Sequence, residues 1–106
     1  PERYEPLGNT RYVSVRQAYR LDPCDRLTLP DQKRIRGVQC NLWTEYIADI
    51  RHAQHMVLPR MAAFAETGWA NDRKDYNDFV RRIPALVAVY NAEGYNYAPY
   101  LFEGIE

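Results

Sequence analysis

Residues 35–45 read IRGVQCNLWTE, and this stretch indicates the fold. Apolar and polar side chains alternate along it: Val38, Cys40 and Leu42 are followed in turn by Gln39, Asn41 and Trp43. Such alternation is typical of a β-strand with two unlike faces, so we predict a strand over residues 36–43. Amide and indole side chains are unusual on a face in bulk water and favour a barrel lumen or a binding cleft.

Trp43 and Glu45 are the candidate site residues, two positions apart where the predicted strand ends. An indole can stack on the apolar face of a sugar ring, and a carboxylate accepts hydrogen bonds from its hydroxyl groups. Active sites of β/α barrels lie at the carboxyl ends of the strands. The residues alone leave a second interpretation open, in which Trp43 is a core residue and Glu45 a solvent-exposed residue at a loop start.

Residues 50–69 predict a helix that begins after Asp49, whose side chain can cap it. Its middle is apolar nearly all round, which indicates burial on several sides. Pro59 lies inside this helix and predicts a kink, because proline has no backbone N–H to donate. Glu66 is interpreted as a structural ion pair, with Arg60 or with a group elsewhere in the chain.

Residues 75–93 predict a second, more clearly amphipathic helix, with Asp75 as its cap and Gly94 as its stop. Residues 15–19 predict a short helix that the preceding serine caps. The aromatic tail over residues 95–106 is expected to pack against other parts of the protein.

Length and charge exclude several classes of protein. A chain of 106 residues has room for one domain, and its 14 basic and 14 acidic residues give a net charge of zero. A nucleic-acid-binding surface usually needs excess positive charge, so we expect no nucleic-acid partner, although arginine and tyrosine keep an RNA-binding element as a weak alternative. No apolar run approaches the roughly 20 residues of a membrane span.

The sequence predicts no metal, no cofactor and no complete catalytic group. His52 and His55 are close enough on one helix to share a ligand, but no third ligand accompanies them, so we interpret both as structural. Cys24 and Cys40 do not have the spacing of a zinc site, and we interpret them as free thiols.

Two long motifs resemble glycoside hydrolase family 20, the β-N-acetylhexosaminidases. Residues 36–47, RGVQCNLWTEYI, are similar to the stretch G-x-Q-x-x-L-W-x-E on that family's last barrel strand. Residues 56–69, MVLPRMAAFAETGW, are similar to the helix that follows it. An Asp-Phe-rich helix start at residues 75–79 and a Gly-x-x-Tyr ending at residues 94–97 come in the family's order, as does the helix leading to Pro23.

The resemblance implies an α/β fold: residues 1–106 would be the C-terminal fragment of a (β/α)8 barrel, mostly helical when isolated. Trp43 would form a wall of the pocket for the terminal N-acetylhexosamine, and Glu45 would accept hydrogen bonds from its distal hydroxyls. The family's catalytic Asp-Glu pair is absent from this chain. In the family's substrate-assisted mechanism, the substrate's acetamido oxygen attacks the anomeric carbon while the Glu protonates the leaving oxygen.

The same resemblance sets expectations for the chain as a whole. Without the acid, the isolated chain should not hydrolyse glycosides. Its apolar middle helix should leave a surface that promotes self-association. A periplasmic, secreted or lysosomal setting is the family expectation. The main alternative is a non-enzymatic helical interaction module, in which Trp43 and Glu45 are ordinary packing and capping residues.

Overall fold

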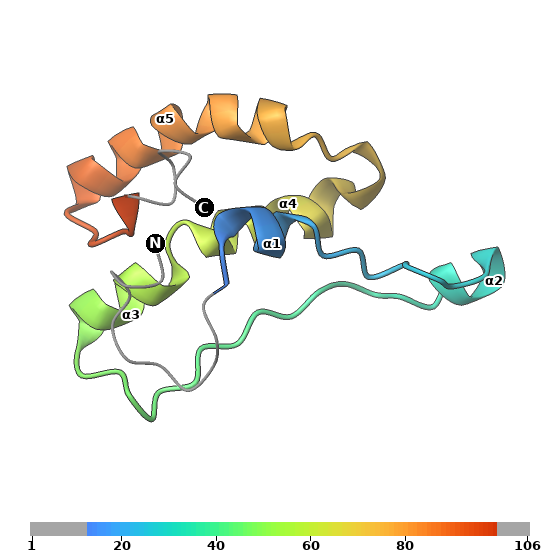
Figure 1. Cartoon of the computed structure of the whole chain (residues 1–106), viewed down its shortest axis with the longest axis horizontal. Helices are drawn as coiled ribbons and strands as arrows, with labels where there is room; N and C mark the ends of the chain where they lie inside the picture. Colours follow the sequence, from blue (N-terminus) through green and yellow to red (C-terminus); the bar gives the residue numbers. More distant parts are fainter. Residues whose placement is uncertain (1–12, 100–106) are drawn as a thin grey trace.

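Most of the helices in this chain gather on one side of a long extended segment. The computed structural model describes residues 13–99. Its elements follow in the order α1 (Val15–Tyr19), α2 (Leu29–Gln32), α3 (Ile50–Val57), α4 (Arg60–Ala70), the 3-10 helix η2 (Asn71–Arg73) and α5 (Tyr76–Glu93). Figure 1 shows α1 against α4, with α5 across them and α2 far from the other helices.

A small core joins α1, α4 and α5. Its buried members come from these helices and from the segment after α5: Val15, Ala18, Tyr19, Ala63, Phe79, Ile83 and Ala98. The rings of Tyr19 and Phe79 meet at a centroid distance of 4.8 Å, so an aromatic contact links the first helix to the last. The backbone N–H of Ala98 donates to the Leu58 carbonyl at 3.0 Å, which holds the chain beyond α5 against the end of α3.

The helix ends confirm the caps that the sequence predicts. Ser14 caps α1 in a reciprocal arrangement with Gln17, in which each side chain accepts from the other residue's backbone N–H. Asp49 caps α3 and Asp75 caps α5. Gly94 ends α5 in the left-handed conformation at φ 73°, which glycine adopts without steric cost.

The predicted helix over residues 50–69 is wrong as one element, because the structure has two helices there. Leu58 takes an extended backbone, at φ −102° and ψ 126°, and ends α3. A residue before proline is disfavoured in the helical region, and Pro59 lacks the N–H that would continue the α3 ladder. The helix is therefore interrupted at the position where the sequence predicts a kink, and a new helix, α4, runs from Arg60 to Ala70.

The predicted strand over residues 36–43 is wrong for this chain, because the structure has unpaired extended backbone there. Residues 13–99 contain no β-strand. A strand requires a neighbouring strand to accept and donate its backbone hydrogen bonds, and these residues supply none. The structure also has a short helix that was not predicted, α2, which begins at Leu29 with Thr28 as its cap.

The predicted packing of the tail holds for the part that the structure describes. The N–H of Tyr95 donates to the Tyr90 carbonyl at 2.9 Å, and the rings of Tyr90 and Tyr97 lie 5.5 Å apart. Residues 100–106 lie outside the described part of the chain.

Candidate functional site

The two candidate residues lie on or just after residues 35–44, which we call the extended segment. It runs from α2 past α1 and α4 toward α3 (Figure 1). One side of the segment faces α4: Val38 Cγ2 lies 3.5 Å from the point that a Cβ on Gly68 would occupy. Burial of the thiol raises the pKa of Cys40, but Cys40 and Leu42 are both exposed as residues. Of the apolar face that the alternation predicts, only Val38 is covered.

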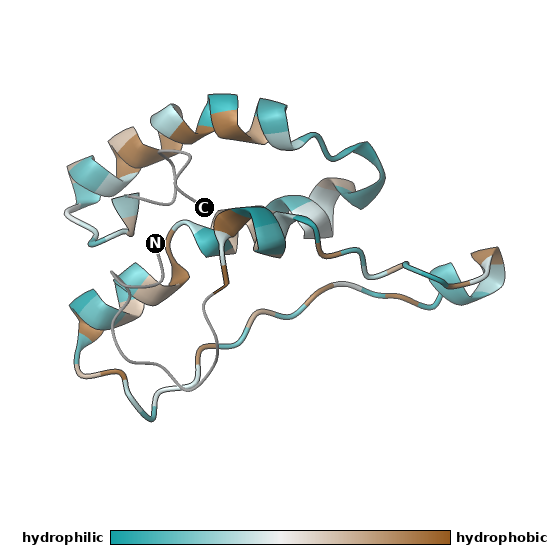
Figure 2. Cartoon of the chain, in the orientation of Figure 1, coloured by the Kyte–Doolittle hydropathy of each residue, from teal (hydrophilic) through white to brown (hydrophobic). Residues whose placement is uncertain are grey.

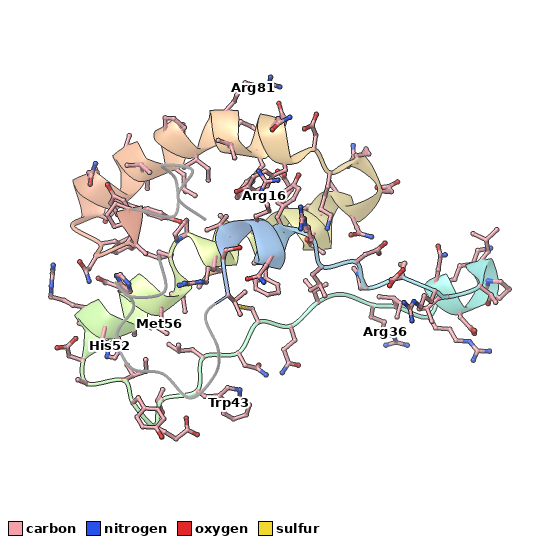
Figure 3. All side chains as sticks on the ribbon, viewed as in Figure 1. Arg16, Arg36, Trp43, His52, Met56 and Arg81 are labelled. Atoms are coloured by element: carbon pink, nitrogen blue, oxygen red, sulfur yellow. The ribbon has the colours of Figure 1, made fainter. Side chains whose placement is uncertain are left out.

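The other side of the extended segment is open to solvent and carries the polar residues. Gln39, Asn41 and Trp43 are exposed, and 60% of Trp43 is accessible. Figure 2 shows hydrophobic and hydrophilic residues alternating along the segment, and Figure 3 shows Trp43 pointing away from the helices. Gln39 Nε2 donates to Asn41 Oδ1 at 2.7 Å, so the two amides are joined on this face.

Glu45 follows in the turn that leads from the extended segment toward α3. The N–H of Ile47 donates to the Thr44 carbonyl at 3.1 Å and closes this turn. The Glu45 residue is exposed. An accessible indole followed two residues later by an accessible carboxylate provides a stacking surface and a hydrogen-bond acceptor, which are two elements of a carbohydrate site.

The second interpretation of Trp43 and Glu45 fits one of the two residues. Glu45 is exposed at the start of a loop, as it expects, but Trp43 is 60% accessible and is not a core residue of this chain. Asp49 caps the helix after Glu45, since Asp49 Oδ1 accepts the His52 N–H at 2.8 Å. The module alternative therefore loses the packing and capping roles that it assigned to this pair.

Glu66 belongs to a structural network and not to the candidate site. Its Oε2 accepts from the Tyr19 hydroxyl at 2.6 Å, and its Oε1 pairs with the Arg82 guanidinium. Arg82 also pairs with Asp78 at 2.8 Å, and this hydrogen bond holds the pKa of the Asp78 carboxyl below its usual range. The structural ion pair is confirmed, but its partner is Arg82.

Two further cations act as structural links. Arg60, which is buried, donates from Nε to the Val13 carbonyl at 2.6 Å and from Nη1 to the Met56 carbonyl at 2.9 Å. Lys74 donates to the carbonyls of Tyr19 and Leu21 at 2.7 and 2.6 Å, and burial lowers its pKa. Arg60 thus ties the start of the described chain to the end of α3, and Lys74 holds the segment after α1. The periodicity of the sequence gives no signal for either contact.

The histidines and cysteines form no metal site in the described chain. His52 Nδ1 accepts from the Ala48 N–H at 3.3 Å, so one ring nitrogen has a local structural partner. Cys24 and Cys40 are both free. Across residues 13–99, no three histidine, cysteine or acidic side chains gather closely enough to hold a metal ion.

An apolar groove of about 580 Å³ lies between α4 and α5. Trp69, which is 86% accessible, and Met61 line it on the α4 side, and Phe79 and Leu86 line it on the α5 side. The predicted burial of α4 on several sides is therefore incomplete, because the side facing this groove is open.

Within the described residues no helix is both long enough and apolar enough to cross a membrane.

Comparison with known proteins gives one consistent family. Residues 2–72 match glycosyl hydrolase family 20, catalytic domain. The chain is 32% identical over 95 residues to a beta-hexosaminidase of Porphyromonas gingivalis, which covers 88% of this chain and 12% of that protein. It is 29% identical over 87 residues to a beta-N-acetylhexosaminidase of Cellulomonas fimi, covering 81% and 18%. A beta-hexosaminidase of Akkermansia muciniphila is 32% identical over 63 residues, covering 59% and 13%.

These matches identify the chain as a glycoside hydrolase sequence. More specifically, it belongs to glycosyl hydrolase family 20, because the family match covers residues 2–72 of 106. The chain spans only 12% to 18% of the length of the first two relatives. Membership implies a piece of a barrel domain, of which the described residues form a helical part.

Proposed function

We propose that this chain is the C-terminal end of the catalytic domain of a β-N-acetylhexosaminidase, which removes terminal N-acetylhexosamine residues from glycans. The names of the relatives, both beta-hexosaminidases, support this activity for the parent enzyme. In this proposal the extended segment is the last barrel strand, and its missing neighbours supply the backbone partners that a strand requires.

Within that domain, Trp43 and Glu45 form one wall of the pocket for the terminal sugar. The observation that carries this assignment is the position of Trp43. It is a largely accessible indole on a segment that lies against α4 through Val38. When a sugar ring stacks on an exposed tryptophan, the indole surface is removed from water, and this burial favours binding. Glu45 then accepts hydrogen bonds from the sugar's distal hydroxyls.

Neither residue transfers a proton in this proposal. Trp43 and Glu45 hold the ring so that the substrate's acetamido oxygen can reach the anomeric carbon, and they act by orientation. The acid that protonates the leaving oxygen belongs to the parent's catalytic Asp-Glu pair, which this chain lacks. The isolated chain should therefore release no aryl alcohol from an aryl N-acetylglucosaminide.

The proposal is tested by the Glu45→Gln substitution in the parent enzyme. A lost hydrogen bond to a charged acceptor should lower kcat/KM on an aryl N-acetylglucosaminide by roughly 10- to 100-fold. Glu93→Gln, at the exposed end of α5, is the matched control and should leave kcat/KM unchanged. Hydrolysis by the Glu45→Gln enzyme at the parent's rate would refute the assigned role.

A further inference from the structure

Gln39 and Asn41 form a joined amide pair beside the proposed sugar wall. Gln39 Nε2 donates to Asn41 Oδ1 at 2.7 Å, a short and well-formed hydrogen bond. Residues two apart on extended backbone point to the same side and lie about 7 Å apart, so the two amides can meet. Both are exposed, and alternation along extended backbone puts them on the same side as Trp43, two residues further on.

The direction of this hydrogen bond sets what Asn41 can offer to a ligand. An asparagine amide has one oxygen that accepts and one amino group that donates. The hydrogen bond from Gln39 turns this oxygen toward residue 39, and the pair makes no other hydrogen bond within residues 13–99. Asn41 therefore presents its amino group as the available donor, and Gln39 fixes that orientation.

We propose that Asn41 donates a hydrogen bond to a hydroxyl oxygen of the bound sugar and that Gln39 is the positioning residue that orients it. This inference rests on the proposed function, since it places the sugar ring on Trp43. Asn41 and Glu45 lie on either side of Trp43 along the chain, two residues from it in each direction. One supplies a donor and the other an acceptor, which matches hydroxyl groups that both accept and donate.

The substitution Gln39→Glu in the parent enzyme tests the orientation. An ionised carboxylate only accepts, so Asn41 must turn its amino group toward residue 39 and its oxygen toward the sugar. We expect KM for an aryl N-acetylglucosaminide to rise about five- to tenfold, with a smaller change in kcat, because a binding contact is lost. Asn41→Asp, which removes the donor directly, should raise KM at least as much.

Gln39→Met is the matched variant that removes the hydrogen bond without reversing it. Asn41 keeps its donor but becomes free to rotate, so we expect KM to rise only about two- to threefold. A KM for the Gln39→Glu and Asn41→Asp enzymes equal to that of the parent would overturn the inference. So would a Gln39→Glu enzyme with a lowered Tm and an unchanged KM, since the pair would then be only structural.

The Glu45→Gln enzyme separates this inference from the proposed function. If Glu45→Gln impairs hydrolysis while Gln39→Glu and Asn41→Asp do not, the amide pair plays no part and the sugar wall stands. If none of the three substitutions changes kcat/KM, the sugar wall itself is wrong. If all three raise KM, and Gln39→Met raises it less than Gln39→Glu, both are supported.

Discussion

One tyrosine hydroxyl joins three helices of this chain. Tyr19 in α1 donates to Glu66 in α4 at 2.6 Å and accepts the N–H of Asp75, the cap of α5, at 2.8 Å. Burial, and then the hydrogen bond to Glu66, raises the pKa of Tyr19 to about 12. The phenol of the folded chain therefore keeps its proton at pH values where an unfolded tyrosine, with a pKa near 10, loses it.

Tyr19 predicts a loss of stability in alkaline solution. A raised pKa gives stability that is complete below about pH 10 and is lost as the pH rises through about 12. The free energy of unfolding should fall across that range by an amount on the order of 2 kcal/mol that is absent in the Tyr19→Phe variant. Denaturant unfolding of both chains at pH 8, 10 and 11 measures the difference.

The same substitution has an effect at neutral pH. Tyr19→Phe leaves Glu66 and the Asp75 N–H without this partner and should cost about 1–2 kcal/mol. Tyr46→Phe, at an exposed tyrosine, is the control and should change the free energy of unfolding by less than about 0.5 kcal/mol. If the free energy of unfolding falls equally with pH in the unsubstituted and the Tyr19→Phe chains, the raised pKa of Tyr19 is contradicted.

At the scale of elements, the end of α5 depends on the backbone conformation of Gly94. Its φ of 73° is strained for any residue with a Cβ. Gly94→Ala should therefore lower the free energy of unfolding by about 1 kcal/mol. At Gly37 an added Cβ would meet nothing within 4 Å, so Gly37→Ala is the matched control and should not destabilise this chain. Thermal unfolding of both variants decides, and equal Tm values would count against the αL cap.

The sequence predictions are most accurate where the signal acts within a few residues along the chain. Ser14, Asp49, Asp75 and Gly94 act on backbone groups within a few residues, and the structure confirms each cap. Pro59 was recognised as an interruption, but its full effect depends on the extended conformation that Leu58 adopts. The helix α2 was not predicted, although Thr28 as a cap followed by an early proline is a local signal for a helix start.

The strand prediction failed because strand pairing is not local. Alternation along residues 36–43 predicted an apolar side, of which only Val38 is covered here, because the alternation cannot supply neighbouring strands. In the candidate site, residue type and spacing drew attention to Trp43 and Glu45, and the resemblance assigned their roles, which stay predictions. The direction of the Gln39–Asn41 hydrogen bond needed atomic positions, because each amide can donate or accept.

At the scale of the whole molecule, the chain is more open than a compact domain of its length. Its radius of gyration is 14.8 Å, against about 13 Å expected for 106 residues. Large apolar side chains are accessible at Ile50 (69%) and Trp69 (86%), and the groove between α4 and α5 is open. These surfaces are consistent with a part that a larger domain would cover.

We therefore predict that the isolated chain self-associates. Burial of accessible apolar surface favours association, so sedimentation velocity should show species larger than a monomer that increase with concentration. Trp69→Ser should shift the distribution toward monomer, since Trp69 lines the groove. Leu29→Ser, on the distant α2, is the control and should shift it less. A stable monomer at all concentrations would contradict this prediction.

The central claim is that Glu45 accepts hydrogen bonds from distal hydroxyls of the sugar that stacks on Trp43. The most direct test measures kcat/KM of the parent enzyme and its Glu45→Gln variant on an aryl N-acetylglucosaminide and on its 4-deoxy and 6-deoxy analogues. If Glu45 contacts a sugar hydroxyl, removing either the carboxylate or the hydroxyl loses the same hydrogen bond, so the effects of the two changes on kcat/KM do not add. The parent should lose about tenfold or more on at least one deoxy substrate, and the variant much less on that same substrate. Equal losses in the two enzymes on both analogues would contradict the claim.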